Sequence, residues 1–173
     1  MSTAAYPSHL ARQRTLADGR QVVIRPVRPE DEAAEREFFD RLSAEAKRMR
    51  FMKFVASVTD QLIHFYSHVD YDRRMAFVCE AGARIVGEAR YGANPDDRSC
   101  EFGVVIADDW HKSGIAGLLM EALIAYARER RFATMEGLVL RENRDMLKFM
   151  RALGFEVAGE PQEPTLMRVV KKL

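Results

Sequence analysis

The stretch Asp108–Met120, DDWHKSGIAGLLM, decides how the rest of this chain is interpreted. The residues before it, Val104 to Ile106, have the apolar character of a strand end. The residues after Gly114 place apolar side chains on one face of a helix. Small residues between the two elements allow a ligand to approach the backbone closely, and Gly114 also tolerates unusual dihedral angles. The stretch is therefore a strand-to-helix loop with an accessible backbone.

Such a loop is suited to an anion. The first turn of a helix carries N–H groups without intrahelical partners and the positive end of the helix dipole. Lys112 adds a charge and Ser113 adds a hydroxyl group. The chain has a formal net charge of only +1, so no overall basic field favours nucleic acid or an anionic membrane surface. We therefore expect this loop to bind a phosphate or pyrophosphate group.

Composition sets the broad class. A chain of 173 residues with 47% hydrophobic and 31% charged residues is typical of one soluble globular domain. The longest apolar run, Gly114–Ala127, is interrupted by Glu121 and is too short to cross a bilayer. The N-terminus lacks the pattern of a signal peptide. Cys79 and Cys100 lie in expected strands without CxxC spacing, which favours reduced core thiols. We therefore expect a cytoplasmic protein without a membrane segment or a metal.

The order of elements predicts a mixed sheet. Residues 1–20 are polar and without pattern, so we expect a flexible arm followed by a single domain over residues 21–173. Alternating or apolar runs predict strands at Val22–Pro29, Met75–Ala81, Arg84–Gly92, Ser99–Ile106, Thr134–Leu140, Phe155–Ala158 and Leu166–Val170. Helical segments are expected from Pro29 to Leu42, from Ser43, from Thr59 to His68, after Gly114 and from Asn143 to Leu153.

Three known types of phosphate-binding loop are candidates for the stretch Asp108–Met120. The P-loop requires GxxxxGK[ST], and the dinucleotide fingerprint requires GxGxxG after the first strand of a parallel unit, so neither fits. His111–Ala116, HKSGIA, resembles the acyl-CoA loop of the GNAT superfamily of N-acetyltransferases, which reads roughly [QR]xxGx[GA]. The sequence departs from that pattern at His111, which replaces Gln or Arg and weakens one side-chain contact.

Other segments strengthen the resemblance. Asn143 followed by Gly154-Phe155 is similar to the second signature of the superfamily, a helix beside the pantetheine arm. Asn143 is also a good helix N-cap, and both roles can hold together. The segments IRPVRPEDE, LSAE, YDRRMAFV, GEARY, EFGVVIADDWHKSGIA and ENRDML look most like the protein lysine acetyltransferase (Pat) branch.

The resemblance implies an α/β (α+β) fold, with a mixed, mostly antiparallel sheet of about seven strands and about four helices. It implies that acetyl-CoA is the cosubstrate. The backbone N–H groups of the splayed strand end would hold the pantetheine and polarise the thioester carbonyl, and a local bulge would free them. The implied cofactor-binding residues are Val104, Val105, Ile106, His111, Lys112, Ser113, Gly114, Ile115, Ala116, Gly117 and Asn143.

Glu101 is the candidate general base. A lysine amine has an ordinary pKa of about 10.4 and must lose a proton before it can attack a thioester. Glu101 lies shortly before Val104, and the missing side chain of Gly103 on the same strand face leaves room beside the carboxylate. In the Pat-like branch the matching glutamate is the base. The alternative is a solvent-facing carboxylate or one paired with a neighbour such as Arg90.

Other candidate groups have simpler explanations. Many members of the superfamily protonate the leaving thiolate with a tyrosine seven positions after the Asn, but Met150 occupies that position here. Tyr91 and Tyr126 are candidates by chemistry only, and none is assigned. His64 and His68 have metal-ligand spacing without an obvious third ligand, so a surface pair is favoured. The basic residues of Lys47–Lys53 form a solvated face or a rim for an acidic protein surface or the CoA 3′-phosphate.

These features together predict an acetyl-CoA-dependent N-acetyltransferase that acts on a protein lysine, for example on an acyl-CoA synthetase. One rival is an enzyme for small amines such as a polyamine, an amino acid or a drug, which would have an acidic acceptor cleft. Another is a non-catalytic CoA-binding module, which the departures at His111 and Met150 leave open. Apolar closing strands with an exposed edge allow either a monomer or a homodimer.

Overall fold

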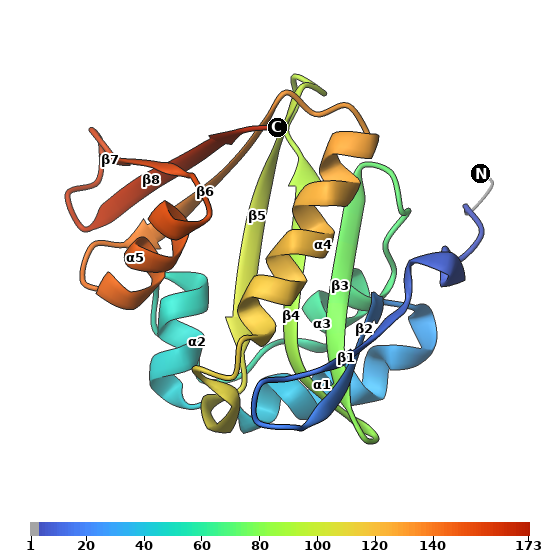
Figure 1. Ribbon diagram of the computed structural model, residues 1–173. Helices are drawn as coiled ribbons and strands as arrows, with labels where there is room; N and C mark the ends of the chain where they lie inside the picture. The colour runs from blue at the N-terminus through green and yellow to red at the C-terminus, as the bar shows by residue number, and fades with distance from the viewer. Residues whose placement is uncertain (1–3) are drawn as a thin grey trace.

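The computed structural model describes residues 4–173 as an eight-stranded sheet with helices on both faces. The strands follow the order β1-β2-β3-β4-β5-β6-β8-β7 (Figure 1). They are β1 Arg12–Thr15, β2 Gln21–Pro26, β3 Arg74–Ala81, β4 Arg84–Ala93, β5 Ser99–Ile106, β6 Thr134–Leu140, β7 Glu156–Gly159 and β8 Leu166–Lys172. The α-helices of the described residues are α1 Glu32–Arg41, α2 Ala44–Phe51, α3 Asp60–Ser67, α4 Ile115–Glu129 and α5 Arg144–Ala152.

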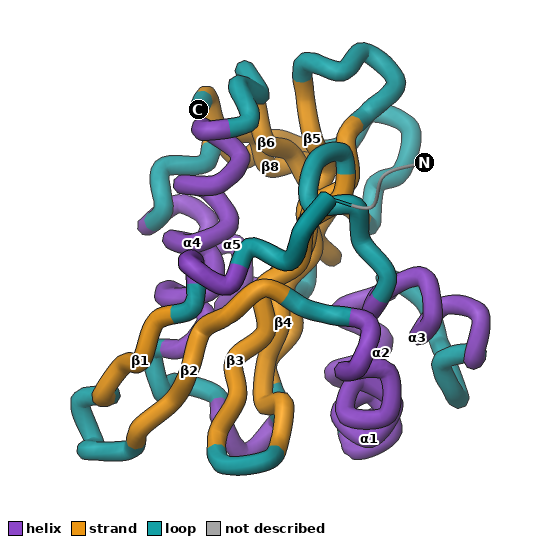
Figure 2. Tube along the Cα trace, turned by 90° about the vertical axis from the view of Figure 1, so that its right-hand side faces the viewer, coloured by secondary structure: helices purple, strands orange, loops and turns teal. Residues whose placement is uncertain are grey.

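The helices form two layers around the sheet. Figure 2 shows α4 and α5 on one side of the strands, with α1, α2 and α3 on the other. The first layer buries an apolar cluster that includes Leu119 and Leu123 of α4. The second buries a separate cluster that includes Phe38, Phe39 and Ile63. Successive strand residues point to opposite faces, so the two clusters together cover both sides of the central strands.

Most of the expected architecture is confirmed, with one correction near the N-terminus. The sheet is mixed and mostly antiparallel, and the bounds of β5 and β6 agree with those expected. The expectation of a flexible arm is wrong for Arg12–Thr15, because these residues pair antiparallel with β2 as strand β1. Residues 1–3 of that arm lie outside the described part of the chain. No helix among the described residues has the length and apolar character needed to span a membrane.

Strands β5 and β6 diverge, and this divergence creates the opening for a site. They are parallel neighbours only from Ser99↔Thr134 to Glu101↔Glu136. Beyond that point they separate, and Figure 1 shows the two strands together at one end and apart at the other. The ring of Phe102 covers Gly137, where an added Cβ would lie 2.7 Å from a ring carbon. Phe102, which follows the last β5–β6 pair, Glu101↔Glu136, therefore packs across the start of the opening between the two strands.

The expected bulge in β5 is absent. The antiparallel ladder between β4 and β5 runs without a register shift from Gly87↔Ile106 to Ala93↔Cys100. The irregularity in this part of the sheet lies instead between β3 and β4, at Cys79/Glu80. The unpaired edge of β5 thus arises from the departure of β6, which frees backbone groups on one side of the strand while the other side stays in the sheet.

A buried ion pair fixes the start of α1. The expected helix from Pro29 begins as a 3₁₀ turn, Pro29–Asp31, before α1. Asp31 is 5% exposed, and the Arg25 guanidinium donates two hydrogen bonds to it at 2.7 and 2.8 Å. Arg25 also donates to Glu80 of β3. The charges in the segment IRPVRPED therefore connect β2, β3 and the first turn before α1.

A second buried charge cluster lies between α1 and the sheet. Glu35 of α1 and Glu88 of β4 are both fully buried, and Arg90 donates a hydrogen bond of 3.0 Å to Glu88. Within the described residues, neither oxygen of Glu35 has a hydrogen-bond partner. Burial and the adjacent Glu88 carboxylate raise the pKa of Glu35 well above its ordinary value. These effects favour the protonated form of Glu35 in the folded protein, against the opposing influence of the Arg90 guanidinium 3.6 Å away.

We expect Glu35→Gln to reduce the loss of unfolding free energy that accompanies a rise in pH from 5 to 8, because the amide has no proton to release. Because the folded-state pKa is raised, the folded protein binds a proton that the unfolded chain releases above about pH 4.3. The free energy of unfolding of the wild type therefore falls as pH rises toward the folded-state pKa, and the amide removes this dependence. Urea denaturation at pH 5 and pH 8 measures it.

The matched control is Glu37→Gln, an exposed carboxylate on the same helix that pairs with Arg41. This variant should show the pH dependence of the wild type. An equal or greater loss of stability with rising pH in Glu35→Gln would contradict the assignment of a buried, protonated carboxyl group.

Candidate active site

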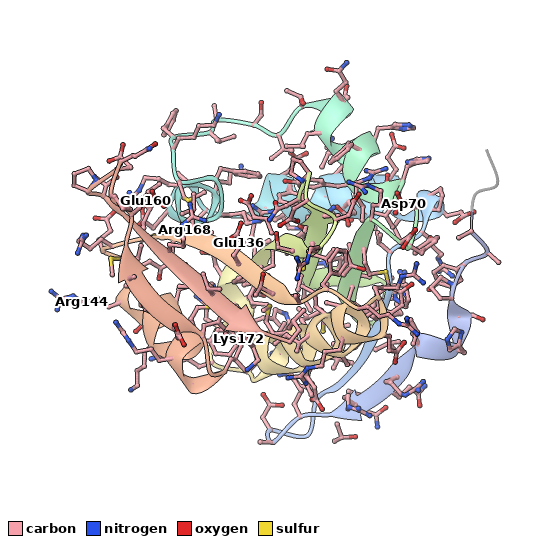
Figure 3. The ribbon with its side chains drawn as sticks, turned by 90° about the horizontal axis from the view of Figure 1, so that it is seen from above. Asp70, Glu136, Arg144, Glu160, Arg168 and Lys172 are labelled. Carbon is pink, nitrogen blue, oxygen red and sulfur yellow. The ribbon has the colours of Figure 1, made fainter. Side chains whose placement is uncertain are left out.

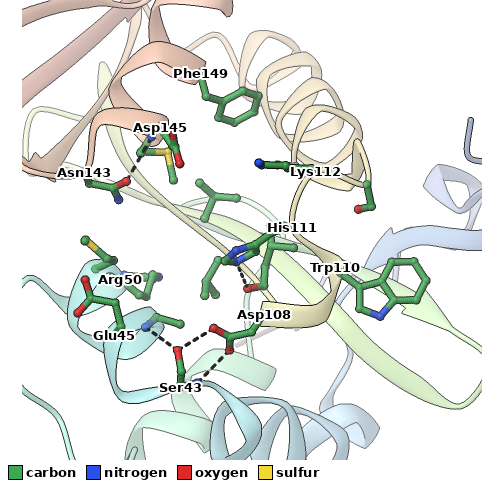
Figure 4. A pocket seen from close by; sticks show the side chains of 18 of the residues that line it. Ser43, Glu45, Arg50, Asp108, Trp110, His111, Lys112, Asn143, Asp145 and Phe149 are labelled. Carbon is green, nitrogen blue, oxygen red and sulfur yellow. Dashed lines mark hydrogen bonds between the residues drawn. The ribbon is translucent and has the colours of Figure 1, made fainter. Parts of the chain in front are cut away.

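A cavity of about 770 Å³ opens where β5 and β6 separate. We call it the main cavity. Figure 4 shows how its walls are built from α2, the end of β5, the loop before α4 and the start of α5. The polar and charged residues that line it include Ser43, Glu45, Arg50, Asp108, His111, Lys112, Ser113, Asn143 and Asp145. Apolar side chains such as Met49, Val104, Met146 and Phe149 complete the lining.

The loop at the start of α4 has the geometry of an anion site. Gly114 is the N-cap of α4 with φ of 92°, a left-handed conformation that favours glycine. Lys112 also has a positive φ, 61°. Gly114 has no side chain to cap this helix end, and among the described residues the Ile115 N–H makes only a long hydrogen bond of 3.4 Å to the Ser113 hydroxyl. Its first N–H groups therefore face the main cavity with the positive end of the helix dipole behind them.

The cavity brings together nearly all the predicted cofactor residues. Val104, Val105, Ile106, His111, Lys112, Ser113, Gly114, Ala116, Gly117 and Asn143 line the main cavity. Ile115 does not: its side chain is 1% exposed and belongs to the core. A contact between the Ile115 side chain and a ligand is therefore excluded by its burial, because the helix turns this position toward the sheet. Asn143 both lines the cavity and caps α5, accepting a hydrogen bond from the Met146 N–H at 3.2 Å.

Two contacts hold the loop in place. The Asp108 carboxylate accepts hydrogen bonds from the backbone N–H of Ser43 at 2.9 Å and from its hydroxyl at 2.7 Å (Figure 4). Ser43 also caps α2, so the loop and α2 are joined at one point. Trp110 lies under the Arg20 guanidinium, 3.9 Å from the ring centroid. The tryptophan of the opening stretch thus packs the loop against the β1–β2 turn.

A smaller pocket of about 60 Å³ adjoins the main cavity and contains Glu101. We call it the side pocket. It shares the residues Met49, Arg50, Val104, Asn143 and Met146 with the main cavity. Its other lining residues include Met52, Phe102, Gly103, Leu138 and Val139. A small space with one carboxylate and a mixed polar and apolar lining therefore adjoins the larger cavity at the point where β5 and β6 separate.

Glu101 is one of two carboxylates at this point, and they differ in their surroundings. Glu136 is its register partner on β6, so both side chains are directed to the same face. Arg168 forms ion pairs with Glu136 and Glu160, at 3.2 and 2.8 Å (Figure 3). Asn94 also donates to Glu136 at 2.9 Å. In the described structure Glu101 has neither an ion pair nor a hydrogen bond, so its lone pairs are available.

The space beside Glu101 is not open, contrary to what the sequence suggested. An added Cβ at Gly103 would lie 2.6 Å from the central guanidinium carbon of Arg50. The Arg50 side chain thus lies over Gly103, and its Nε is buried without a partner among the described residues. Among the described residues, its only hydrogen bond is a long one of 3.4 Å to the Tyr66 hydroxyl. A cation therefore stands at the junction of the two cavities, a feature that sequence spacing alone did not reveal.

The basic residues of Lys47–Lys53 do not form one rim. Lys47 is 8% exposed and lies inside the helical layer. Arg48 pairs with Glu45 and with Glu142, which joins α2 to the turn before α5. Arg50 is directed at Gly103, and Lys53 is the one basic residue of this segment that is exposed. The expectation of a continuous basic surface over this segment is therefore wrong, because helical geometry and ion pairing distribute the four charges.

Among the described residues, no tyrosine lines either cavity. Met150 is fully buried in the core. The Tyr91 hydroxyl donates to the Asp72 carbonyl, and the Tyr126 hydroxyl donates to the Tyr71 carbonyl. Cys100 is fully buried beside Glu101, and burial raises the pKa of its thiol to about 12. The alternation of β5 directs it away from Glu101, as expected, so a thiolate nucleophile is disfavoured.

Comparison with known proteins identifies the class. Residues 21–156 match the model of the acetyltransferase (GNAT) domain. The chain is 37% identical over 155 residues to the acetyltransferase PA5475 of Pseudomonas aeruginosa, a match covering 87% of this chain and 83% of that protein. The protein is therefore a member of the GNAT family, an acetyl-CoA-dependent acyltransferase.

Solved structures show the same fold. The GNAT domain of S. lividans PAT superposes with a TM-score of 0.90 at 24% identity, covering 97% of this chain and 99% of that domain. The acetyltransferase yncA from Salmonella typhimurium, solved with acetyl-CoA, has a TM-score of 0.74 at 20% identity and covers 88% of this chain and 94% of that one. These likenesses establish the fold predicted from the opening stretch.

Proposed function

We propose that this acetyltransferase transfers the acetyl group to the side chain of a lysine on a protein, for example an acyl-CoA synthetase, with Glu101 as general base. The observation that carries the proposal is the arrangement of the two connected cavities. The main cavity has an anion-binding helix end, and the side pocket has an unpaired carboxylate at the point where β5 and β6 separate. A thioester at the junction would lie within reach of an amine entering from the side pocket.

The loop from His111 to Gly117 is assigned to the CoA pyrophosphate. The N–H groups at the start of α4 would donate to the phosphate oxygens, and Lys112 would add a positive charge. The free edge of β5, Val104 to Ile106, would bind the pantetheine amides, and Asn143 would lie beside that arm. These residues come from three separate elements, and all of them except Ile115 line the main cavity.

The transfer step follows from the positions of these groups. Glu101 accepts a proton from the lysine ammonium, directly or through a water, and the neutral nitrogen attacks the thioester carbon. The backbone N–H groups of the β5 edge stabilise the negative charge on the carbonyl oxygen. When the intermediate collapses, the C–S bond breaks, an amide forms and CoA leaves as a thiolate. Thiolate is a fair leaving group, so no tyrosine is required at the position of Met150.

The form of the side pocket favours a lysine over a polyamine. Met49, Met52 and Leu138 contribute apolar side chains to its wall, and these suit the unbranched alkyl chain of a lysine. Its only acidic lining residue within the described structure is Glu101, and Arg50 adds a positive charge. A polycationic acceptor would be repelled by Arg50 and would need more acidic groups. An exposed lysine of a protein brings one amine, and its other contacts can be made outside the pocket.

The proposal is tested by following thiol release from acetyl-CoA with purified protein and two sets of acceptors. One set is a purified acyl-CoA synthetase, and the other is a panel of polyamines, amino acids and aminoglycosides. Turnover with the synthetase is expected. Turnover only with the small amines would replace the proposed acceptor, and acetyl-CoA binding without turnover in either set would favour the non-catalytic alternative.

Gly117→Glu is expected to weaken acetyl-CoA binding by roughly 10- to 100-fold, since like charges a few ångströms apart cost about 1–3 kcal/mol near a protein surface. Gly117 lies in the first turn of α4, and an added Cβ there would meet no atom within 4 Å. The new carboxylate would therefore extend toward the main cavity without displacing the backbone. Isothermal titration calorimetry measures the dissociation constant.

The matched control is Gly117→Ala, which adds the same Cβ without the charge and should bind acetyl-CoA within a few-fold of the wild type. Equal affinities of Gly117→Glu and Gly117→Ala would show that the pyrophosphate is held elsewhere.

A further inference from the structure

We infer that the protein has a binding site for a divalent transition-metal ion of the Zn²⁺ type, formed by Glu32, His64 and His68. The site is separate from both cavities. Glu32 lies in the first turn of α1, and the two histidines lie at the end of α3. One ligand atom from each of the three residues lies within 4.8 Å of the others, close enough for a single ion to contact all three.

The sequence indicated two of the three ligands, His64 and His68, but not the third. His64 and His68 are four residues apart, which places their side chains on one face of α3. Their rings stack with centroids 3.9 Å apart. Glu32 is 32 residues earlier in the chain, and its carboxylate lies 3.1 Å from His64 Nδ1 and 3.8 Å from His68 Nδ1. The third ligand is thus provided by packing between α1 and α3, which lie on the same side of the sheet (Figure 2).

Two further features of the site favour a metal. Metal-ligating histidines usually donate their second ring N–H to a carbonyl or carboxylate, which fixes the ring orientation. His68 Nδ1 lies 2.9 Å from the His64 carbonyl oxygen, so that contact can fix the ring and leave Nε2 free for an ion. Both histidines also lie at the C-terminal end of α3, where the helix dipole favours a positive charge.

The donor set selects the kind of ion. Two imidazoles and one carboxylate match the ligands of three-residue zinc sites, in which a water completes the tetrahedron. Mg²⁺ prefers oxygen ligands and octahedral geometry, so two nitrogen donors disfavour it. The three side chains are exposed or half-buried, so an ion can enter without unfolding. An ion held there would join the start of α1 to the end of α3 and stabilise the folded state.

The test is calorimetric titration of Zn²⁺ into the untagged protein at pH 7.5, with thermal denaturation in the presence and absence of the ion. We expect one Zn²⁺ per chain and an increase of several degrees in Tm. Mg²⁺ at the same concentrations should change neither quantity. His64→Gln and His68→Gln should each weaken Zn²⁺ binding at least tenfold and abolish the increase in Tm, and Glu32→Gln should weaken it as well.

The matched control is His9→Gln, which removes an exposed histidine outside the site and should retain Zn²⁺ binding. The Tm of each variant without metal shows whether it folds, so loss of binding is distinguished from loss of structure. Absence of stoichiometric Zn²⁺ binding by the wild type would overturn the inference. Unchanged binding by folded His64→Gln and His68→Gln would also overturn it, since the ion would then be held by other residues.

Discussion

Glu101→Gln is expected to lower kcat for acetyl transfer about 10²- to 10⁴-fold, the usual contribution of a positioned general base. The amide has nearly the shape of the carboxylate but cannot accept the proton of the attacking ammonium. Affinity for acetyl-CoA should stay within a few-fold of the wild type, because Glu101 lines the side pocket and not the main cavity. Steady-state kinetics with saturating acceptor measures kcat, and calorimetry measures the affinity.

The pH profile of this variant adds a second criterion. Its residual rate should rise steadily with pH, as the fraction of free lysine amine grows toward its pKa of about 10.4. Glu136→Gln is the matched control, since it removes the neighbouring carboxylate that Arg168 and Asn94 already hold. That control should keep kcat within a few-fold. If Glu136→Gln lowered kcat more than Glu101→Gln did, the general base would be Glu136 of β6 and not Glu101 of β5.

Arg25→Ala is expected to lower the free energy of unfolding by about 3–5 kcal/mol, the usual effect of removing one partner of a buried ion pair. The Arg25 side chain is 8% exposed and binds Asp31, which is 6% exposed, through two short hydrogen bonds. Without the guanidinium, the buried Asp31 carboxylate would keep only the Arg28 backbone N–H at 2.9 Å and the half-exposed Arg28 side chain at 3.7 Å as partners. Urea denaturation at pH 7 measures the loss.

Two variants separate this effect from a general sensitivity to arginine loss. Arg14→Ala removes an exposed guanidinium from the adjacent strand β1 and should change stability by less than about 0.5 kcal/mol. The double variant Arg25→Met with Asp31→Asn removes both charges and should be more stable than Arg25→Ala. If the double variant had a free energy of unfolding equal to or lower than that of Arg25→Ala, the loss of stability would arise from packing around Arg25 and not from the unpaired Asp31 carboxylate.

Sequence periodicity predicted most of the fold because most strands bury at least one face. β5 and β6 are examples, since apolar residues and flanking turns marked their ends. β1 could not be predicted this way, because all four of its residues are exposed. Its stability comes from pairing with β2, an interaction that leaves no hydrophobic pattern. The prediction of a bulge in β5 was wrong for a similar reason. The free edge of β5 comes from its divergence from β6, and this divergence depends on tertiary contacts such as that of Phe102 with Gly137.

The candidate site was predictable where it is local in sequence. The loop from His111 to Gly117 and the cap residue Asn143 were identified from short motifs, and all of these residues except Ile115 line one cavity. Groups brought together by tertiary packing were missed. Arg50 reaches Gly103 from a different layer, and Glu136 becomes the neighbour of Glu101 only through the parallel pairing of β5 and β6. Sequence spacing could not show that Arg168 neutralises one of these two carboxylates.

The most direct test of the proposed function is the identification of the acetylated atom. A purified acyl-CoA synthetase would be incubated with acetyl-CoA and either the wild-type protein or Glu101→Gln, and the digests would be compared by tandem mass spectrometry. We expect acetyl groups on the Nζ of one or a few lysines with the wild type, and nearly none above the enzyme-free background with Glu101→Gln. Acetylation to the same extent by both proteins, or no acetyl-lysine with an active wild-type enzyme, would contradict it.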